Sequence, residues 1–263
     1  MRGQFMKEVA ALGLTRDFDP GAPVSETDLI ALPEPVQRYL RWMGVIGQSR
    51  DWSFRASFTG RFRRTPDERW MKCEAWQYNS RPVLARIFHL RIHFGGLVPV
   101  LGRDTYMNGR GRMLVKMLDL FTVADGKGEE FDIGELVTYL NDAVFIAPSM
   151  LLVPEVRWSP VDDHSFDVSL TDHGRTVTAR VFTDTDGMPV NFSTTDRFCA
   201  DPKDPKRLVR ARWTTPIEEW RSIKGRQLWT RGQAVWDTPS GKFPYADFTL
   251  IPGSVAFNVA PGA

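Results

Sequence analysis

Polar side chains that could recognise a ligand are densest in the stretch from Arg103 to Arg110. Arginine guanidinium groups donate paired hydrogen bonds to anionic groups, and aromatic rings such as that of Tyr106 can stack on a ligand. Polar residues further along the chain could help to orient the same molecule. We therefore predict a ligand-binding site that comprises Trp70, Gln77, Arg103, Asp104, Tyr106, Arg110, Asn141 and Asp142.

A second interpretation of these residues needs no ligand. Asp104 and the arginines would form the solvated face of a strand, and Asn141 and Asp142 would end a helix. Strand geometry supports the site only in part, because neighbouring residues of a strand lie on opposite faces and Arg103 therefore points away from Asp104. Both interpretations remain open from the sequence.

A pair of carboxylates could also catalyse a reaction. Asp104 with either Glu135 or Asp142 could act as acid and base in a hydrolase or an isomerase, provided that burial separates their pKa values. No nucleophile stands beside a base in a known pattern, and no phosphate-binding loop or dinucleotide fingerprint occurs. We therefore place catalysis behind ligand binding.

His89 and His93 suggest a metal site at first sight, because histidines four residues apart can share a metal on a helix. The surrounding residues Phe88, Leu90 and Ile92 alternate with them, which is the period of a strand. Strand residues four apart are separated by roughly 13 Å at about 3.3 Å per residue. We therefore predict a polar sheet face here, with no metal and no other cofactor.

Composition excludes several classes of protein. The 263 residues carry 34 basic and 32 acidic side chains, and a net charge of +2 is too small for a dedicated nucleic-acid binder. The N-terminal residues lack the apolar stretch of a signal peptide, and no window approaches the roughly 20 apolar residues of a membrane span. We expect a cytoplasmic protein that has no transmembrane segment and no nucleic-acid partner.

The clearest strand covers residues 52–62, where Phe54, Ala56 and Phe58 alternate with polar or cationic residues. Similar segments follow at 70–78, 84–94 and 103–115, the last of which is interrupted by Asn108 and Gly109. An Asn-Gly step favours a two-residue hairpin turn. The second half of the chain continues in the same way at 166–170, 177–182 and 190–198, and the charged stretch 201–207 is interpreted as an exposed loop.

Helical signals are confined to two places. The first is residues 33–43. The second begins at Asp132, where Glu135 completes a capping box, and continues through a second short helix from Pro148 to Leu152. We therefore predict a mainly β fold, a long curved antiparallel sheet or half-barrel with a short helical pair at about 131–152 packed against one face. Residues 31–263 would form one domain, preceded by an extension over residues 1–30.

Two motifs carry a resemblance to a known family. The block Leu-Pro-Glu-Pro-Val-Gln-Arg-Tyr-Leu spans residues 32–40, and the pattern Asp-x-Tyr-x-x-Gly-x-Gly-x-Met spans residues 104–113. With these motifs the chain resembles an uncharacterised bacterial family, a domain of unknown function, over roughly residues 30–250. The acidic residue after Leu140 and Asn141 looks like Glu in that family and is Asp142 here, which weakens the case for a catalytic role at this position.

The expected fold is loosely similar to the curved half-barrel of bacterial lipoprotein carriers of the LolA and LolB type. That similarity implies a concave apolar face that a lipid-like molecule could fill. Our first hypothesis is therefore a protein that binds a hydrophobic or amphipathic small molecule, with peripheral membrane contact as a further expectation. The alternatives are the carboxylate hydrolase or isomerase and a structural domain that docks another protein.

Overall fold

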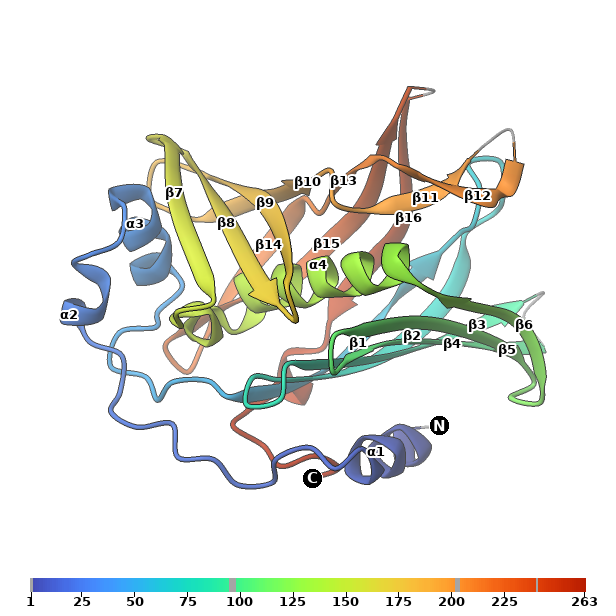
Figure 1. The fold of residues 1–263 in the computed structure, drawn as a ribbon, viewed down its shortest axis with the longest axis horizontal. Coiled ribbons are helices and arrows are strands. Elements are labelled where there is room, and N and C mark those ends of the chain that lie inside the picture. The colour runs from blue at the N-terminus through green and yellow to red at the C-terminus, as the bar shows by residue number, and fades with distance from the viewer. Residues whose placement is uncertain (1, 95–97, 202–203, 240) are drawn as a thin grey trace.

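A long, curved sheet dominates the computed structural model, which describes residues 2–94, 98–201, 204–239 and 241–263. Fifteen strands of the described residues form this sheet, and every strand pair in it is antiparallel. The strands wrap around one long helix, α4 (Glu129–Ile146) (Figure 1). The predicted fold class is therefore confirmed.

The strands are β1 (Ser53–Phe62), β2 (Met71–Ser80), β3 (Ala85–Phe94), β4 (Val98–Met107), β5 (Arg110–Met117), β6 (Phe121–Lys127), β7 (Val156–Asp162), β8 (Ser165–Asp172), β9 (Arg175–Thr183), β10 (Pro189–Thr194), β11 (Phe198–Asp201), β12 (Asp204–Arg210), β13 (Arg212–Thr214), β14 (Ile217–Ile223), β15 (Arg226–Thr238), β16 (Gly241–Leu250) and β17 (Ala256–Phe257). The other helices are α1 (Arg2–Ala11), α2 (Glu26–Leu29) and α3 (Glu34–Trp42), with 3-10 turns η1 (Pro148–Leu151) and η2 (Pro252–Ser254).

The strand order shows how the sheet is assembled. It runs β6-β5-β4-β3-β2-β1-β16-β15-β13-β10-β9-β8-β7, while β14 and β17 pair with β15 and β1. Two meanders, β1–β6 and β7–β10, are thus joined through the C-terminal strands β15 and β16. A separate two-stranded sheet consists of β11 and β12.

Alternation along β1 produces the two faces of the sheet. Phe54, Ala56 and Phe58 are buried on the concave side, and the intervening Arg55 is partly exposed on the other. The predicted hairpin between β4 and β5 is also confirmed. Asn108 (φ 52°) and Gly109 (φ 71°) both adopt the left-handed conformation that a two-residue turn of this kind requires.

The start of α4 differs from the prediction. The helix begins at Glu129, so Asp132 lies inside its first turn and does not cap it. Its carboxylate instead accepts a hydrogen bond of 2.7 Å from the backbone N–H of Gly111. A Cβ at Gly111 would stand only 2.1 Å from the carbonyl oxygen of Phe131, so only glycine lets the helix and β5 approach so closely. The second predicted helix appears as η1.

The N-terminal residues contain two helices that the sequence analysis did not predict. Phe5 and Val9 of α1 are buried in a small apolar cluster with Tyr78 and Ile87 of the sheet. In Figure 1, α1 lies on the side of β1–β4 that faces away from α4. Within the described ranges, no helix is both long enough and apolar enough to cross a membrane.

The prediction of an exposed loop at residues 201–207 is wrong in part. Asp204 begins strand β12, which pairs with β11 in a hairpin, while Pro202 lies outside the described residues. A segment rich in charged residues and proline is typical of a turn, but it can also form an edge strand of a small sheet. The predicted strand 190–198 is likewise divided, since β10 ends at Thr194 and β11 begins at Phe198.

Candidate functional site

A cavity of about 160 Å³ lies between α4 and the sheet strands that curve around it. Its apolar lining comes mainly from aromatic side chains, and its polar lining contains five side chains that can carry charge. The aromatic and aliphatic residues include Phe58, Phe62, Phe88, Leu90, Phe145, Ile146, Trp213, Ile217, Trp229, Tyr245 and Phe248. The charged residues are Arg86, Asp104, Glu135, Asp142 and Arg197.

The alternation of side chains between the two faces of a strand determines which residues of the sheet line the cavity. Arg86, Phe88 and Leu90 alternate along β3 and all line the cavity, as does Asp104, which stands opposite Phe88 on β4. The intervening residues point to the other face, where His89 contacts Phe5 of α1 with a ring separation of 5.1 Å. The site therefore occupies the concave face of the sheet.

Helical spacing places the remaining charged groups. Glu135, Thr138, Asp142 and Phe145 follow at intervals of three or four residues, so they share the face of α4 that lines the cavity. The opposite side of the helix is apolar and packs into the main core, for example through Leu140. The side of α4 that lines the cavity therefore carries two acidic residues, of which Glu135 is buried and Asp142 is partly buried.

Arg86 is the centre of the charged group. Its Nη1 donates to Oε2 of Glu135 at 2.9 Å, and its Nε donates to Oδ2 of Asp142 at 2.6 Å. The guanidinium also lies 4.9 Å from the ring centre of Phe88, a cation–π contact. One buried arginine thus connects the sheet to two carboxylates of the helix.

Asp104 and Arg197 have no direct ionic partner in the part of the chain that the structure describes. The Asp104 carboxylate accepts no hydrogen bond there, and the charges of Arg86 and Arg197 favour its ionised form against desolvation. Arg197 donates Nη1 to the carbonyl oxygen of Gly134 at 3.2 Å and stacks 4.5 Å from a ring of Trp213. Its Nε is buried without a hydrogen-bond partner.

Burial changes the acidity of the carboxyl groups in this cavity. Desolvation, followed by repulsion from the Asp104 carboxylate, raises the pKa of Glu135 to about 7. Desolvation also raises the pKa of Asp104 and of Asp142, against the opposing charge of Arg86. Glu135 can therefore hold or release a proton near neutral pH.

Four of the eight residues predicted for a ligand site line the cavity: Gln77, Asp104, Asn141 and Asp142. Gln77 donates to Asn79 at 2.9 Å, and the amide of Asn141 donates to Thr215 Oγ1 at 2.6 Å. Glu135, which the sequence suggested only as a catalytic partner, belongs to the same cavity.

The structure places Trp70 and Arg103 elsewhere. The Trp70 ring stacks with Arg63 at 4.5 Å, next to strand β2 and away from the cavity lining. Arg103 pairs with Asp119 at 2.6 Å and with Glu8 at 3.2 Å on the outer face of the sheet. Strand parity explains this position, because Arg103 neighbours the inward-facing Asp104.

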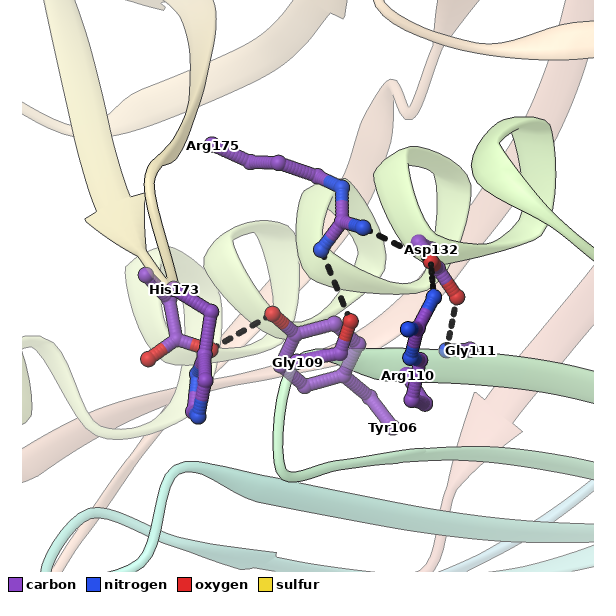
Figure 2. Close-up of polar contacts among 8 residues, drawn as sticks. Tyr106, Gly109, Arg110, Gly111, Asp132, His173 and Arg175 are labelled. Atoms are coloured by element: carbon purple, nitrogen blue, oxygen red, sulfur yellow. Dashed lines mark hydrogen bonds and ion pairs between the residues drawn. The ribbon is translucent and has the colours of Figure 1, made fainter.

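Tyr106 and Arg110 belong to a structural cluster that Figure 2 shows. We call it the hairpin clamp. The hydroxyl of Tyr106 donates to Oδ2 of Asp172 at 2.6 Å, and Arg110 lies 3.2 Å from Asp132 with its side chain 78% exposed. The clamp consists of Tyr106, Gly109, Arg110, Gly111, Asp132, Asp172, His173 and Arg175.

The hairpin clamp joins two distant hairpins to the first turn of α4. Arg175 donates to the carbonyl oxygen of Gly109 at 2.8 Å and to Asp132 at 2.9 Å (Figure 2). A Cβ at Gly109 would lie 2.6 Å from the His173 ring, so the close contact of the two turns requires glycine there. The glycines of the 104–113 motif therefore serve the fold, while its Asp104 faces the cavity.

The sequence analysis missed Arg86 and Arg197 as site residues. A signal for Arg86 was present, because it has the same strand parity as the apolar Phe88, Leu90 and Ile92. A charged residue on an otherwise apolar strand face must find a buried partner. Arg197 follows the end of β10, and no local pattern indicates that it turns towards the helix.

No group of three or more metal-binding side chains comes together within the described residues. His89 is buried beside α1, and burial followed by the nearby charge of Arg103 lowers its pKa to about 4. Its Nε2 lies 3.1 Å from Glu8. The polar face predicted around His89 is therefore covered by a helix at this point.

Comparisons with known proteins identify relatives without an assigned activity. The sequence matches a family of unknown function (DUF6544) over residues 22–248. No curated protein matches. Among solved structures, a LolA superfamily protein from Nitrosomonas europaea matches with 14% identity and a TM-score of 0.40 over 82% of this chain and 90% of its own. A β-barrel-like protein of the DUF1849 domain from Brucella abortus matches with 10% identity and a TM-score of 0.27 over 79% of this chain and 98% of its own.

Proposed function

The chain belongs to the DUF6544 family of unknown function, and we propose that it binds a small amphipathic molecule in the cavity between α4 and the sheet. The observation that carries this proposal is the composition of the cavity lining. Aromatic residues such as Phe58, Trp229 and Phe248 offer an apolar surface, and buried charged groups stand beside them. Such a combination of an apolar lining and few polar groups is typical of ligand sites.

The volume limits the size of the bound part. An apolar cavity of about 150 Å³ takes up one benzene molecule, and the present cavity is of the same order, about 160 Å³. A ring or a chain of about six carbons therefore fits, since one methylene group occupies only a fraction of that volume. A larger lipid would place one segment in the cavity and the rest outside it.

Calorimetric titration with hexan-1-ol tests the proposal, because this probe has an apolar chain and a neutral polar head. Ala234 lines the cavity, and the substitution Ala234→Leu would fill part of it. We expect this variant to lose hexanol binding and to gain about 0.5–2 kcal/mol of stability, as cavity filling does. Ala200→Leu at an exposed position is the matched control and should bind normally. Absence of hexanol binding by the wild type, or retention of it by Ala234→Leu, would contradict the proposal.

A second candidate function is acid–base catalysis by Asp104 and Glu135. The raised pKa of Glu135, about 7, is the property that a general acid or base needs near neutral pH. Arg86 binds the carboxylates of both Glu135 and Asp142, and within the described residues Asp104 is the acidic residue of the cavity that accepts no hydrogen bond. The rate of p-nitrophenyl acetate hydrolysis should then change with pH around the pKa of Glu135. This hydrolysis should disappear in the variant Glu135→Gln. Turnover that is unchanged in this variant would exclude Glu135 from catalysis.

We also propose peripheral contact with a membrane through the turn between β5 and β6. Leu120 is 74% exposed, Phe121 64% and Val123 60%, and Met117 and Leu118 are also exposed. Five large apolar side chains therefore face solvent on one hairpin at the edge of the sheet. Exposed apolar groups gathered in this way favour a site of association over a purely solvated surface.

A further inference from the structure

The charges that line the cavity do not balance. Three carboxyl groups, Asp104, Glu135 and Asp142, face two guanidinium groups, Arg86 and Arg197. If all five groups are ionised, the cavity carries one excess negative charge. Arg86 and Glu135 are buried and the other three groups are partly buried. An uncompensated charge is unfavourable in such a site, and a proton or a cation would neutralise it.

Hydrogen bonding shows where the excess is located. Arg86 is occupied by Glu135 and Asp142, to which it donates directly. Arg197 donates to neutral groups and stacks on Trp213. Within the described residues, Asp104 is left as the carboxylate of the cavity without a hydrogen-bond donor. The site therefore offers an unused anionic acceptor beside an apolar lining.

We infer that the polar head of the bound molecule is a cation, such as a protonated amine, and that Asp104 binds it. This inference rests on the proposed function, because it identifies the chemical class of the molecule that enters the same cavity. The ammonium group would donate to Asp104, and the hydrocarbon part would lie against Phe88, which stands opposite Asp104 on the neighbouring strand. Charge-assisted hydrogen bonds of this kind are roughly twice as strong as neutral ones.

Binding of a cation would also be coupled to the protonation of Glu135, whose pKa burial raises to about 7. Glu135 is surrounded by Asp104 from β4, Arg86 from β3, Arg197 from the segment after β10 and Asp142 from α4. Below a pH of about 7 one carboxyl group of the ligand-free protein keeps its proton, and when the ammonium ion enters, that proton leaves to solvent. The net charge of the cavity stays the same, since one positive charge replaces another.

The test compares three probes of equal chain length, n-hexylammonium, hexan-1-ol and hexanoate, in calorimetric titrations at about pH 8, where amines remain protonated. We expect n-hexylammonium to bind at least about tenfold more tightly than hexan-1-ol, because a hydrogen bond to a charged partner exceeds a neutral one. At about pH 6 its affinity should fall by about tenfold, since a proton must first leave, while hexan-1-ol binding should not change.

The substitution Asp104→Asn tests the role of this carboxylate, since it removes the charge of the side chain and keeps its shape. The variant should lose the preference for n-hexylammonium and keep its affinity for hexan-1-ol, which also shows that it is folded. Asp125→Asn, on an exposed ion pair with Arg112, is the control for a change in net charge and should behave as the wild type. If Asp104→Asn does not fold, Glu135→Gln removes the excess negative charge and the group with the raised pKa, so it should lower the preference for n-hexylammonium and remove its dependence on pH.

The outcomes separate this inference from the function on which it rests. Tighter binding of hexanoate than of n-hexylammonium would overturn the inference and assign the head group to Arg197, with ligand binding retained. Equal binding of all three probes, or a preference for n-hexylammonium that survives in Asp104→Asn, would overturn it as well. Failure of every probe to bind would contradict the proposed function itself.

Discussion

Nη1 of Arg86 on β3 donates a hydrogen bond of 2.9 Å to Oε2 of Glu135 on α4, and both side chains are buried. This contact connects the sheet to the helix at the wall of the cavity. Because the same guanidinium also binds Asp142, one residue stabilises a buried and a partly buried carboxylate of the helix. We therefore expect this charged group to affect both the stability of the protein and the proposed ligand binding.

The first prediction concerns this arginine. Arg86→Met keeps most of the side-chain length but leaves two buried carboxylates without their partner, and breaking a buried pair in this way costs roughly 3–5 kcal/mol. Urea unfolding followed by tryptophan fluorescence should show a loss of that size in the free energy of unfolding. Arg112→Met, which breaks the exposed pair with Asp125, should cost at most about 1 kcal/mol. Equal losses in the two variants would mean that the Arg86 pair is not buried in solution.

The second prediction concerns pH. The pKa of Glu135 is raised from 4.5 to about 7 in the folded protein, so between these values the folded state holds a proton that the unfolded state has lost. The contribution of Glu135 to the free energy of unfolding therefore falls as pH rises from about 4.5 to about 7. Glu135→Gln removes this titration. Urea unfolding across the pH range should show the stability of the variant, relative to wild type, increasing through that window. If the difference in the free energy of unfolding between Glu135→Gln and wild type is constant with pH, the pKa of Glu135 is not raised.

Much of the fold is readable from local patterns. The alternation in residues 52–62 and the Asn-Gly turn at 108–109 indicate β1 and the β4–β5 hairpin directly, because pleat and turn geometry depend on neighbouring residues. The start of α4 is different. Its capping box at Asp132 is a valid local signal, but the contact of Asp132 with Gly111 is a tertiary one that a sequence pattern does not contain.

The candidate site was only half predictable, for a related reason. Asp104 and Asp142 come from two segments with strong local signals, and in the structure both line one cavity. Tyr106 was predicted for the same site as an aromatic ring that could stack on the ligand, yet its hydroxyl donates to Asp172 from a hairpin far along the chain. Trp229 of β15 enters the cavity because β15 and β16 lie between the two meanders in the sheet.

The third prediction concerns the exposed hairpin between β5 and β6. Burying one large apolar side chain contributes roughly 1.5–3 kcal/mol, so the double substitution Leu120→Ser and Phe121→Ser should reduce binding to phosphatidylcholine–phosphatidylglycerol vesicles by at least about tenfold. Co-sedimentation with vesicles measures this, and the variant should keep the stability of the wild type because both side chains are exposed. Ile30→Ser is the matched control, since Ile30 is 74% exposed outside this hairpin, and the vesicle binding of this variant should not change.

Wild-type protein that stays in the supernatant, or an equal loss of vesicle binding in the Ile30 variant, would show that the hairpin is no membrane contact. Retained hexan-1-ol binding by the double variant would then separate the two surfaces, because the hairpin residues do not line the cavity.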